Sequence, residues 1–283
     1  SSHSMQPSAP KSPSVMSGIM RKLAAAMLLA RGAVSVKPAL RSSSSVANAT
    51  APTVALSTAS KHQGAPCQCE ASNPAWKVCQ RTTPKCIFID LGAANGNSFD
   101  TFLSNGHGPV ANCPSGQWEA FLVEANPRFD EPLQKLVTRY PTQVHAQKST
   151  AAFFCEGTTT FYLDTQNHAQ NYWGSSLSSN HPDTQKSGLQ GVSVHLMNLN
   201  RLLVEQTTPG DWVMVKMDIE GSEFDVLPCL AKAPSATLID RLYMEEHSPS
   251  WSLGGGSKQA FDDAKALLKQ RGIDVPPYFS QTL

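Results

Sequence analysis

The chain has 283 residues, of which 40% are hydrophobic and 16% are charged. This length suffices for one large domain with a tail, and the composition excludes a highly charged disordered protein. No apolar run approaches the roughly 18–20 residues that a membrane-spanning helix needs, so we expect no transmembrane helix.

The net charge of +1 hides an asymmetry along the chain. Seven Lys and Arg residues but no acid precede Glu70. Without those seven, 16 of the 23 basic residues remain against 22 acidic ones, a net charge of −6. A mildly acidic domain therefore follows a basic leader, and this balance argues against a broad nucleic-acid-binding surface.

We interpret residues 1–66, which are rich in Ser, Ala, Pro and Thr, as a leader that is disordered or cleaved. An acid-free stretch rich in Arg and Ser is typical of an organellar transit peptide. Alternatively, Arg21 and Lys22 followed by the apolar residues 23–30 resemble a secretory signal peptide. Both kinds of targeting, and an untargeted tail, therefore stay open. We expect the protein to be soluble after processing.

Residues 67–85 form a Cys-rich segment ahead of the first expected strand. Four cysteines fall within twenty residues there: Cys67, Cys69, Cys79 and Cys86. Their spacing lacks the paired C-x2-C pattern of zinc sites, so we expect disulfides that pin this segment in an oxidising compartment. Cys113 is a further candidate for these disulfides. Cys155 and Cys229 lie among apolar residues, and we expect them to be plain core thiols.

From Cys86 to the end, residues 86–283, the pattern alternates between strands and helices. The expected strands are residues 86–91, 120–124, 143–146, 158–163, 212–218 and 238–245. The expected helices begin at Ser98 as N-cap, cover Leu133 to Tyr140, and cover residues 260–268 before Gly272. This alternation predicts an α/β domain with a doubly wound, mostly parallel sheet and helices on both faces.

Two longer stretches interrupt the pattern. Residues 104–118 read as a Gly/Pro/Asn loop, and residues 164–191 are long, polar and spotted with aromatic side chains. A loop of that length inside a compact domain is usually functional or mobile. Residues 164–191 are therefore either a substrate lid or a disordered surface insertion.

The segment from Asp90 to Gly96 follows a strand and opens a helix, and its small residues let a ligand approach the backbone. Its glycines, Gly92 and Gly96, do not have the G-x-G-x-x-G spacing of NAD-binding proteins. An acid before the first glycine would repel a pyrophosphate but would hold an ammonium group. Glu124, at the end of the second strand, can accept both hydroxyls of a ribose. A ligand with an ammonium group, a carboxylate for the donors at the start of the helix, and a ribose is expected here. These three groups together indicate S-adenosylmethionine.

Lys216, Asp218 and Glu220 share one face of a strand by their period of two. Three charges at the end of a central strand are costly unless they are paired or face a solvated cleft. These residues are therefore either the polar floor of an active site or a local salt-bridge network.

The chain resembles the FkbM-type class I methyltransferases. The resemblance rests on residues 88–96, 123–127, 174–177, 215–223 and 244–247. It implies a seven-stranded, Rossmann-like methyltransferase sheet and S-adenosylmethionine as methyl donor. Ala94 departs from the family, which usually has a polar residue there. The predicted cofactor-binding residues are Asp90, Gly92, Ala93, Asn95, Gly96, Glu124, Ala125 and Asn126.

Methyl transfer to a hydroxyl needs a base for the proton. His247 follows the last expected strand and titrates near neutrality, which makes it the first candidate base, although a plain surface histidine fits as well. Asp218 is the alternative base or a ligand, and Lys216 is a third catalytic candidate. Oxygen ligands from Asp218, Glu220 and Glu245 suit Mg²⁺, but we assign no metal. The histidines for which we expect no role in the site are His145, His168, His181 and His195.

We therefore expect an S-adenosylmethionine-dependent O-methyltransferase. The resemblance does not specify the acceptor, and a sugar, a lipid-linked or another small hydroxyl compound fits, so the partner is a small molecule or glycan. One alternative is an NAD or nucleotide-sugar oxidoreductase on a similar sheet. The other is a non-catalytic binding module with the methyltransferase fold.

Overall fold

A five-stranded parallel sheet forms the centre of the computed structural model, which describes residues 67, 69, 72–108 and 118–278. Its strands are ordered β3-β2-β1-β7-β8, and all its pairs are parallel. The strands are β1 (Cys86–Leu91), β2 (Trp118–Val123), β3 (Val144–Gln147), β7 (Trp212–Met217) and β8 (Arg241–Met244). The predicted leader, residues 1–66, and Cys113 lie outside the described residues.

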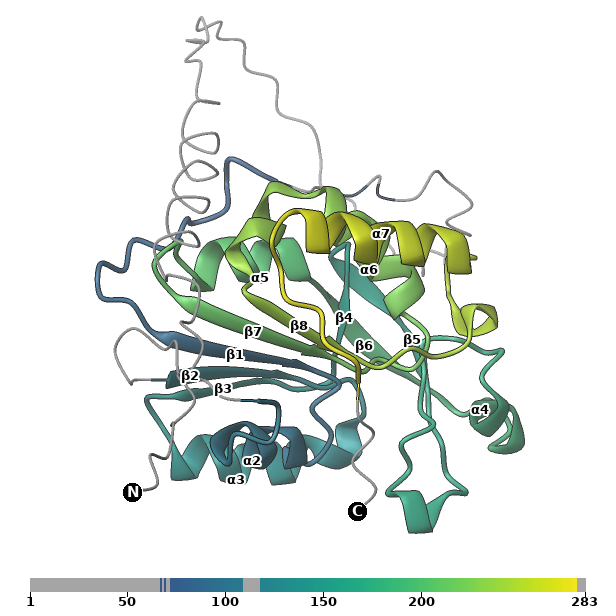
Figure 1. The fold of residues 1–283 in the computed structure, drawn as a ribbon. Coiled ribbons are helices and arrows are strands. Elements are labelled where there is room, and N and C mark those ends of the chain that lie inside the picture. The colour runs from purple at the N-terminus through teal and green to yellow at the C-terminus, as the bar shows by residue number, and fades with distance from the viewer. Residues whose placement is uncertain (1–66, 68, 70–71, 109–117, 279–283) are drawn as a thin grey trace, which may run out of the picture.

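Helices cover both faces of this sheet (Figure 1). On one side lie α2 (Asn97–Leu103) and α3 (Asp130–Arg139), and on the other α5 (Leu199–Gln206), α6 (Glu223–Lys232) and α7 (Lys258–Gln270). Each side has its own apolar core, around Phe88 and Phe99 on the first side and around Phe224 and Phe261 on the second. The predicted doubly wound α/β class is therefore confirmed. None of the helices among the described residues combines the length and apolar character needed to cross a membrane.

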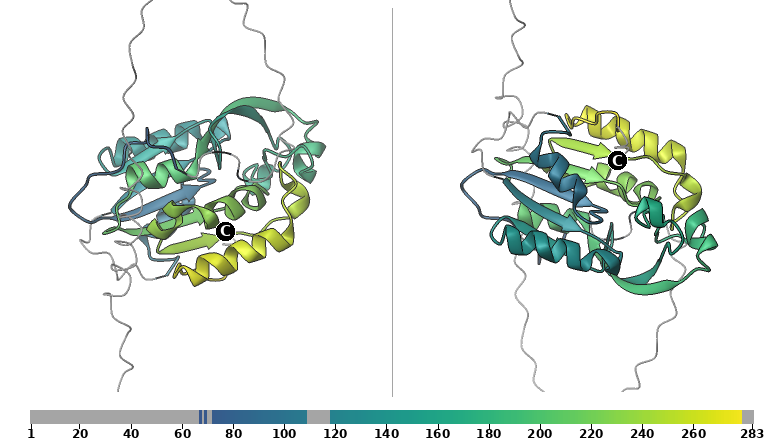
Figure 2. Two further views of the ribbon diagram at one scale, coloured as in Figure 1. Left: turned by 90° about the horizontal axis from the view of Figure 1, so that it is seen from above. Right: turned by 90° about the horizontal axis from the view of Figure 1, so that it is seen from below.

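A second, three-stranded sheet lies beyond the carboxyl ends of the parallel strands (Figures 1 and 2). It consists of β4 (Thr150–Phe153), β5 (Gly157–Tyr162) and β6 (Gly191–Asn198) in the order β4-β6-β5. The expectation of one seven-stranded sheet was wrong on the strand count. The chain turns at Ser149, where φ is +49°, and β6 then pairs with β4 and β5 and not with the central sheet.

Some predicted helices and strands agree with the observed ones, and others differ in their bounds or were not predicted. The first strand and the helices α3 and α7 lie where the sequence predicts them. Ser98, however, lies inside α2, whose N-cap is Gly96 with φ of +89°. The helix α6 was not predicted, because nearly all its residues are buried and its apolar pattern has no polar face. The last predicted strand, residues 238–245, begins too early, because Leu238 still belongs to the 3-10 turn η3 (Pro234–Leu238) and β8 spans Arg241–Met244.

The stretch 164–191 is an ordered part of the domain. It contains η2 (His168–Gln170) and α4 (Pro182–Lys186), and Ser176 bridges to Tyr162 at the end of β5. Residues 174–178 are buried. The alternative of a disordered surface insertion is therefore wrong for this segment.

Two disulfides fasten the Cys-rich segment to the domain. Cys67 is bonded to Cys229 on α6, and Cys69 is bonded to Cys155, which follows β4. The expectation of a disulfide-pinned segment is confirmed, but the expectation that Cys155 and Cys229 are core thiols was wrong. Cys229 is buried and Cys155 is half-buried, and each is one partner of a cross-link to the Cys-rich segment. Among the described cysteines, Cys79 is free, and Cys86 is disulfide-bonded.

These cross-links generate a prediction. The Cys67–Cys229 bond closes a loop with a sequence separation of 162, which restricts the unfolded chain. Replacing both cysteines by serine should therefore lower the free energy of unfolding by about 2–5 kcal/mol. Urea unfolding without reductant measures this change. The free thiol supplies the control, since Cys79→Ser should shift stability by less than about 0.5 kcal/mol. A double variant as stable as the parent would contradict the structure.

Candidate active site

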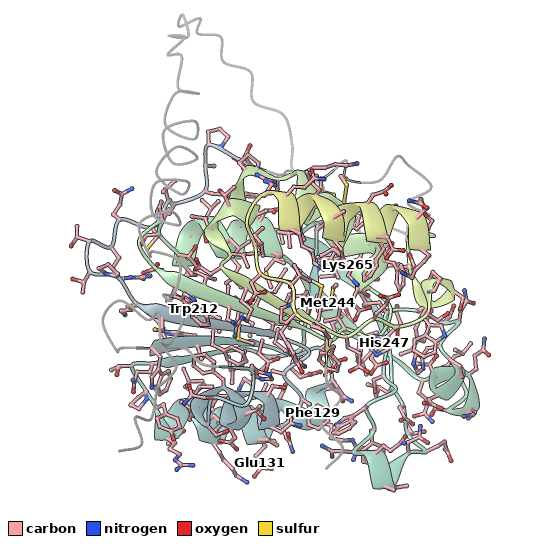
Figure 3. All side chains as sticks on the ribbon, in the orientation of Figure 1. Phe129, Glu131, Trp212, Met244, His247 and Lys265 are labelled. Atoms are coloured by element: carbon pink, nitrogen blue, oxygen red, sulfur yellow. A yellow bond between two sulfur atoms is a disulfide. The ribbon has the colours of Figure 1, made fainter. Side chains whose placement is uncertain are left out.

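A pocket of about 200 Å³ lies at the carboxyl edge of the central sheet. The loops after β1, β2, β7 and β8 line it, together with β4, β5 and the segment 164–190. In Figure 3 the strands run from Trp212, at the start of β7, toward Met244 and His247. This is the edge at which parallel α/β sheets bind their ligands.

Lys216 places an ammonium between two carboxylates at the junction of β1 and β7. Asp90 and Lys216 are register partners on these strands, so their side chains leave the sheet on the same face. The Lys216 Nζ atom lies 3.5 Å from Asp90 Oδ1 and 3.2 Å from Asp218 Oδ2. It also donates a hydrogen bond of 3.0 Å to the Gly92 carbonyl oxygen. One buried cation therefore ties the end of β1 to the loop that follows β7.

Burial and pairing set the charges of this group. Burial raises the pKa of Asp90 to about 6, although the Lys216 ammonium opposes the shift. Burial lowers the pKa of Lys216, but the carboxylates of Asp218 and Asp90 outweigh it and raise that pKa above its ordinary value. Lys216 is therefore a cation and not a base at neutral pH. The sequence left two interpretations of Lys216, Asp218 and Glu220, the floor of an active site or a salt-bridge network. The two are compatible, because these residues form ion pairs and also line the pocket.

Glu124 stands directly after β2 with its carboxylate in the pocket lining. Its Oε2 accepts the Ala94 N–H at 2.7 Å, and its Oε1 accepts the Asn126 N–H at 2.6 Å. Burial raises the pKa of Glu124 to about 7, although these two hydrogen bonds lower it. Each oxygen keeps a further lone pair, so the carboxylate can still accept two hydroxyl groups.

The glycines of the first loop serve close packing. A Cβ on Gly92 would lie 1.8 Å from the Asp218 carbonyl oxygen, and one on Gly96 would lie 2.2 Å from Leu136 Cδ1. Both residues have positive φ. Gly92 thereby lets the loop after β7 approach the loop after β1, which brings Asp218 to the pocket.

Of the eight predicted cofactor residues, the pocket brings together Gly92, Glu124, Ala125 and Asn126. The other four lie elsewhere. Asp90 faces Lys216 beneath the pocket floor, Ala93 lies in the core beside α2, Asn95 is exposed, and Gly96 packs on Leu136. The three predicted catalytic residues, Lys216, Asp218 and His247, all line the pocket.

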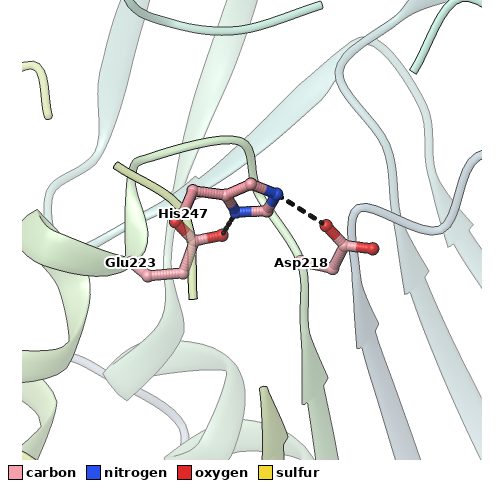
Figure 4. Close-up of side chains that lie close together, drawn as sticks. All are labelled: Asp218, Glu223 and His247. Carbon is pink, nitrogen blue, oxygen red and sulfur yellow. Dashed lines mark hydrogen bonds and ion pairs between the residues drawn. The ribbon is translucent and has the colours of Figure 1, made fainter. Parts of the chain in front are cut away.

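His247 is held by a buried carboxylate at the start of α6 (Figure 4). Its Nδ1 lies 3.1 Å from Glu223 Oε1. Glu223 also accepts the backbone N–H groups of Ile219 and Gly221, at 2.6 and 2.8 Å. The same carboxylate therefore fixes both the loop that follows Asp218 and the imidazole ring.

The surroundings of His247 change its expected role. Burial lowers the pKa of the imidazole, but Glu223, Glu220 and Asp218 outweigh burial and raise the pKa to about 10. The ring is therefore protonated at neutral pH and donates hydrogen bonds. This argues against His247 as the general base and leaves Asp218 as the base candidate.

Two serines of the segment 164–190 connect it to the site. Asn126 donates a hydrogen bond of 3.1 Å from its side chain to Ser175 Oγ, and Ser176 Oγ donates one of 2.7 Å to the Glu220 carbonyl oxygen. Tyr172 and Trp173 of the same segment line the pocket. The segment therefore forms one wall of the site.

Sequence reasoning missed Tyr278 and His181. Tyr278 lines the pocket, and its hydroxyl donates to Asp218 Oδ2 at 3.4 Å. Burial and the carboxylates of Asp218 and Glu245 raise its pKa, so the hydroxyl stays neutral. His181, which we expected to have no role, has its Nε2 3.3 Å from Glu220 Oε2. Neither residue directly follows a core strand, so the pattern of strands in the sequence did not indicate them. The short apolar run that forms β4 could have been predicted as a strand, but it was not.

Five parallel strands, helices on both faces and a pocket at the carboxyl edge define a Rossmann-like α/β protein. The family model of the methyltransferase FkbM domain matches residues 90–274. The chain therefore belongs to the FkbM methyltransferase family. A search of the curated proteins and a search of the solved structures each found no match.

The raised pKa of Glu124 generates a pH prediction. Between pH 6 and 8 its carboxyl group loses a proton, and a carboxylate accepts hydroxyl hydrogen bonds more strongly than a neutral acid does. The affinity for S-adenosylhomocysteine should therefore rise roughly tenfold over this range, as measured by isothermal titration calorimetry. The variant Glu124→Gln cannot ionise and should show a flat profile. Equal slopes for the two proteins would contradict this role of Glu124.

Proposed function

We propose that this methyltransferase moves the methyl group of S-adenosylmethionine to a hydroxyl group of a sugar or another small acceptor. The observation that carries the proposal is the convergence of Glu124 and Asp218 on one pocket, each directly after a parallel strand. The carboxylate of Glu124 suits the cofactor, and the carboxylate of Asp218 suits the acceptor.

The cofactor part of the proposal is supported by the residues around Glu124. This carboxylate has lone pairs left for the two ribose hydroxyls, and Val123, Phe129 and Ala151 offer an apolar surface for a base. Bound S-adenosylmethionine would supply the methyl group on a sulfonium, which becomes a neutral thioether when the methyl leaves. Asp90 differs from its expected role, since its carboxylate faces Lys216. We propose that Asp90 positions Lys216.

The acceptor part is supported by the loops after β7 and β8. They contribute the carboxylates of Asp218, Glu220 and Glu245, next to the rings of Tyr243 and Tyr278. Carboxylates accept hydrogen bonds from hydroxyl groups, and rings cover the apolar face of a sugar. This set of groups favours a neutral polyhydroxyl acceptor over an anionic one.

Asp218 is the residue that we propose for proton transfer. Its Oδ2 is held by the Lys216 ammonium and the Tyr278 hydroxyl, whereas its Oδ1 has the more distant His247 ring as its neighbour (Figure 4). During transfer the acceptor oxygen forms a bond to the methyl carbon, and its proton passes to Asp218. The protonated ring of His247 stands 3.8 Å from Asp218 Oδ1 and can donate to an acceptor oxygen.

An oxidoreductase, which the sequence left as an alternative, fits the pocket less well. An oxidoreductase would bring the pyrophosphate of NAD or of a nucleotide-sugar against four pocket carboxylates, those of Glu124, Asp218, Glu220 and Glu245. Titration calorimetry with S-adenosylhomocysteine and with NAD separates the methyltransferase from the oxidoreductase, and methyl transfer itself separates it from a binding module. Binding of NAD alone would overturn the proposal, as would binding of neither compound.

For the domain organisation we propose a leader over residues 1–66, a Cys-rich segment over residues 67–85 and a methyltransferase domain over residues 86–283. The disulfides from Cys67 and Cys69 to the domain favour maturation in an oxidising compartment. They support the secretory reading of the leader over the organellar one.

The role of Asp218 generates the next prediction. Asp218→Asn should change the affinity for S-adenosylhomocysteine by less than about threefold. The same variant should reduce methyl transfer about a hundredfold or more, the scale of a lost acid–base group. The assay follows tritium from methyl-labelled S-adenosylmethionine into a panel of neutral sugars and glycans.

The control for this experiment is Asp262→Asn, an exposed residue of α7 that pairs with Lys258. It should leave both quantities unchanged. Normal turnover by the folded Asp218→Asn variant would remove Asp218 from the chemistry and return His247 as base. Loss of the fold would assign Asp218 to the scaffold.

A further inference from the structure

The last residues that the structure describes form an arm beside β8, the edge strand of the central sheet (Figure 1). The arm is fixed at Asp274, whose N–H donates to the Asp240 carbonyl oxygen at 2.9 Å and whose carbonyl oxygen accepts the Leu242 N–H at 2.8 Å. The carboxylate of Asp274 also lies 2.9 Å from Arg241 Nε. Backbone and side chain therefore both attach the start of the arm to β8.

The arm continues from Asp274 through Val275, Pro276 and Pro277 to Tyr278. Each proline ring fixes its own φ at about −65° and disfavours helical backbone in the residue before it. The spacer between Asp274 and Tyr278 therefore has little conformational freedom. It delivers the ring of Tyr278 to the lining of the pocket.

The ring and the hydroxyl of Tyr278 both have partners on the acceptor side of the pocket. The ring packs on that of Tyr243 from β8, with their centroids 4.8 Å apart. The hydroxyl donates to Asp218 Oδ2 at 3.4 Å, and the Glu245 carboxylate is a second hydrogen-bond partner. Burial and these two carboxylates raise the pKa of Tyr278 above its ordinary value. The hydroxyl therefore keeps its proton and acts as a neutral donor, not as a base.

The hydroxyl of Tyr278 helps to fix the orientation of the Asp218 carboxylate. Lys216 Nζ holds Asp218 Oδ2 from β7, at 3.2 Å, but the same ammonium also serves Asp90 at the end of β1. Tyr278 holds this oxygen from the arm. Two donors on Oδ2 restrict rotation of the carboxylate, so that Oδ1 stays beside the His247 ring, 3.8 Å away. Orientation matters for a base, because a displacement of about 1 Å can reduce a rate a hundredfold.

Tyr278 lies outside the region that this chain shares with its family. The matched residues end at 274, the anchor of the arm, whereas Asp218, Tyr243 and Glu245 lie within them. The pocket therefore combines carboxylates of the matched domain with a tyrosine from the segment that follows it.

We propose that Tyr278 is a positioning residue for methyl transfer, which orients Asp218 through Oδ2 and covers the acceptor with its ring beside Tyr243. The inference rests on the proposed function, because Tyr278 acts through Asp218. The acceptor proton passes to Asp218 Oδ1, and the proton of Tyr278 stays on its own oxygen. The hydroxyl thus serves the rate of transfer, the ring serves acceptor binding, and substitutions can separate the two.

The first experiment measures methyl transfer by the full chain, with labelled S-adenosylmethionine and the panel of neutral sugars and glycans. Tyr278→Phe keeps the ring and removes the donor, so kcat should fall about tenfold while the KM for the acceptor changes by less than about threefold. Tyr278→Leu also removes the ring, so KM should rise about tenfold as well. In an Asp218→Asn background, Tyr278→Phe should change kcat by less than about twofold, because the group that it orients is already lost.

The matched control is Tyr140→Phe. Tyr140 is also a partly buried tyrosine packed on the same apolar core, but it lies outside the pocket lining. This variant should keep the kcat and KM of the parent. Normal kcat in the folded Tyr278→Phe variant, or an equal loss in the Asp218→Asn background, would overturn the positioning role.

A measurement without turnover tests the contact between Tyr278 and Asp218. In protein made with tyrosine that carries a heavy carbon isotope at Cζ, the magnetic resonance signal that disappears in Tyr278→Phe belongs to Tyr278. This signal should shift in Asp218→Asn, which changes the hydrogen-bond acceptor, while the signal of Tyr140 stays in place. An unmoved Tyr278 signal would show that the contact does not exist.

Calorimetry with S-adenosylhomocysteine on the same samples separates the two proposals. A parent protein that binds no S-adenosylhomocysteine, or that methylates nothing in the panel, contradicts the proposed function, and the role of Tyr278 fails with it. An active parent with an equally active Tyr278→Phe variant contradicts the role of Tyr278 alone.

Discussion

A buried ammonium is the constraint on which this site depends. Lys216 belongs to a central strand and is almost fully buried, and an unpaired charge there would be very costly. Asp90 at the end of β1, the Gly92 carbonyl oxygen in the loop after β1, and Asp218 in the loop after β7 surround it. The need to satisfy one cation therefore fixes the distance between the loop after β1 and the loop after β7.

Elsewhere in the site, buried carboxylates hold loops in place as the buried Lys216 cation does. Glu124 and Glu223 are buried carboxylates at the start of a loop and of a helix. Glu124 accepts one backbone N–H from the loop after β1 and one from the loop after β2, and Glu223 accepts two from the loop after β7. Buried charges satisfied by backbone are rigid, because moving them would leave polar groups unpaired. The pocket is thereby shaped before any ligand arrives, and the groups left toward it are those with spare lone pairs.

The parallel-sheet rule explains how much the sequence could predict. Glu124, Asp218 and His247 each follow a buried strand, and strand ends meet at one edge, so their convergence was predictable. The contribution of Tyr278 was not, since it arrives through a segment that runs beside β8, where Asp274 bridges to Arg241. The burial of Asp90 also escaped prediction, because its partner depends on the register of β1 against β7. What could not be predicted was side-chain pairing across distant segments, above all the disulfides.

Those disulfides set a demand on biosynthesis. Cys67 and Cys69 are synthesised first, but their partners follow 162 and 86 residues later, at Cys229 and Cys155. Meanwhile Cys79 and Cys86 are close by along the chain, and short loops close more readily than long ones. The native pairs become favourable only after β4 and α6 have packed. A cell that makes this protein therefore needs thiol–disulfide exchange to undo early pairs, and a host without an isomerase should accumulate folded sheet with the wrong bonds.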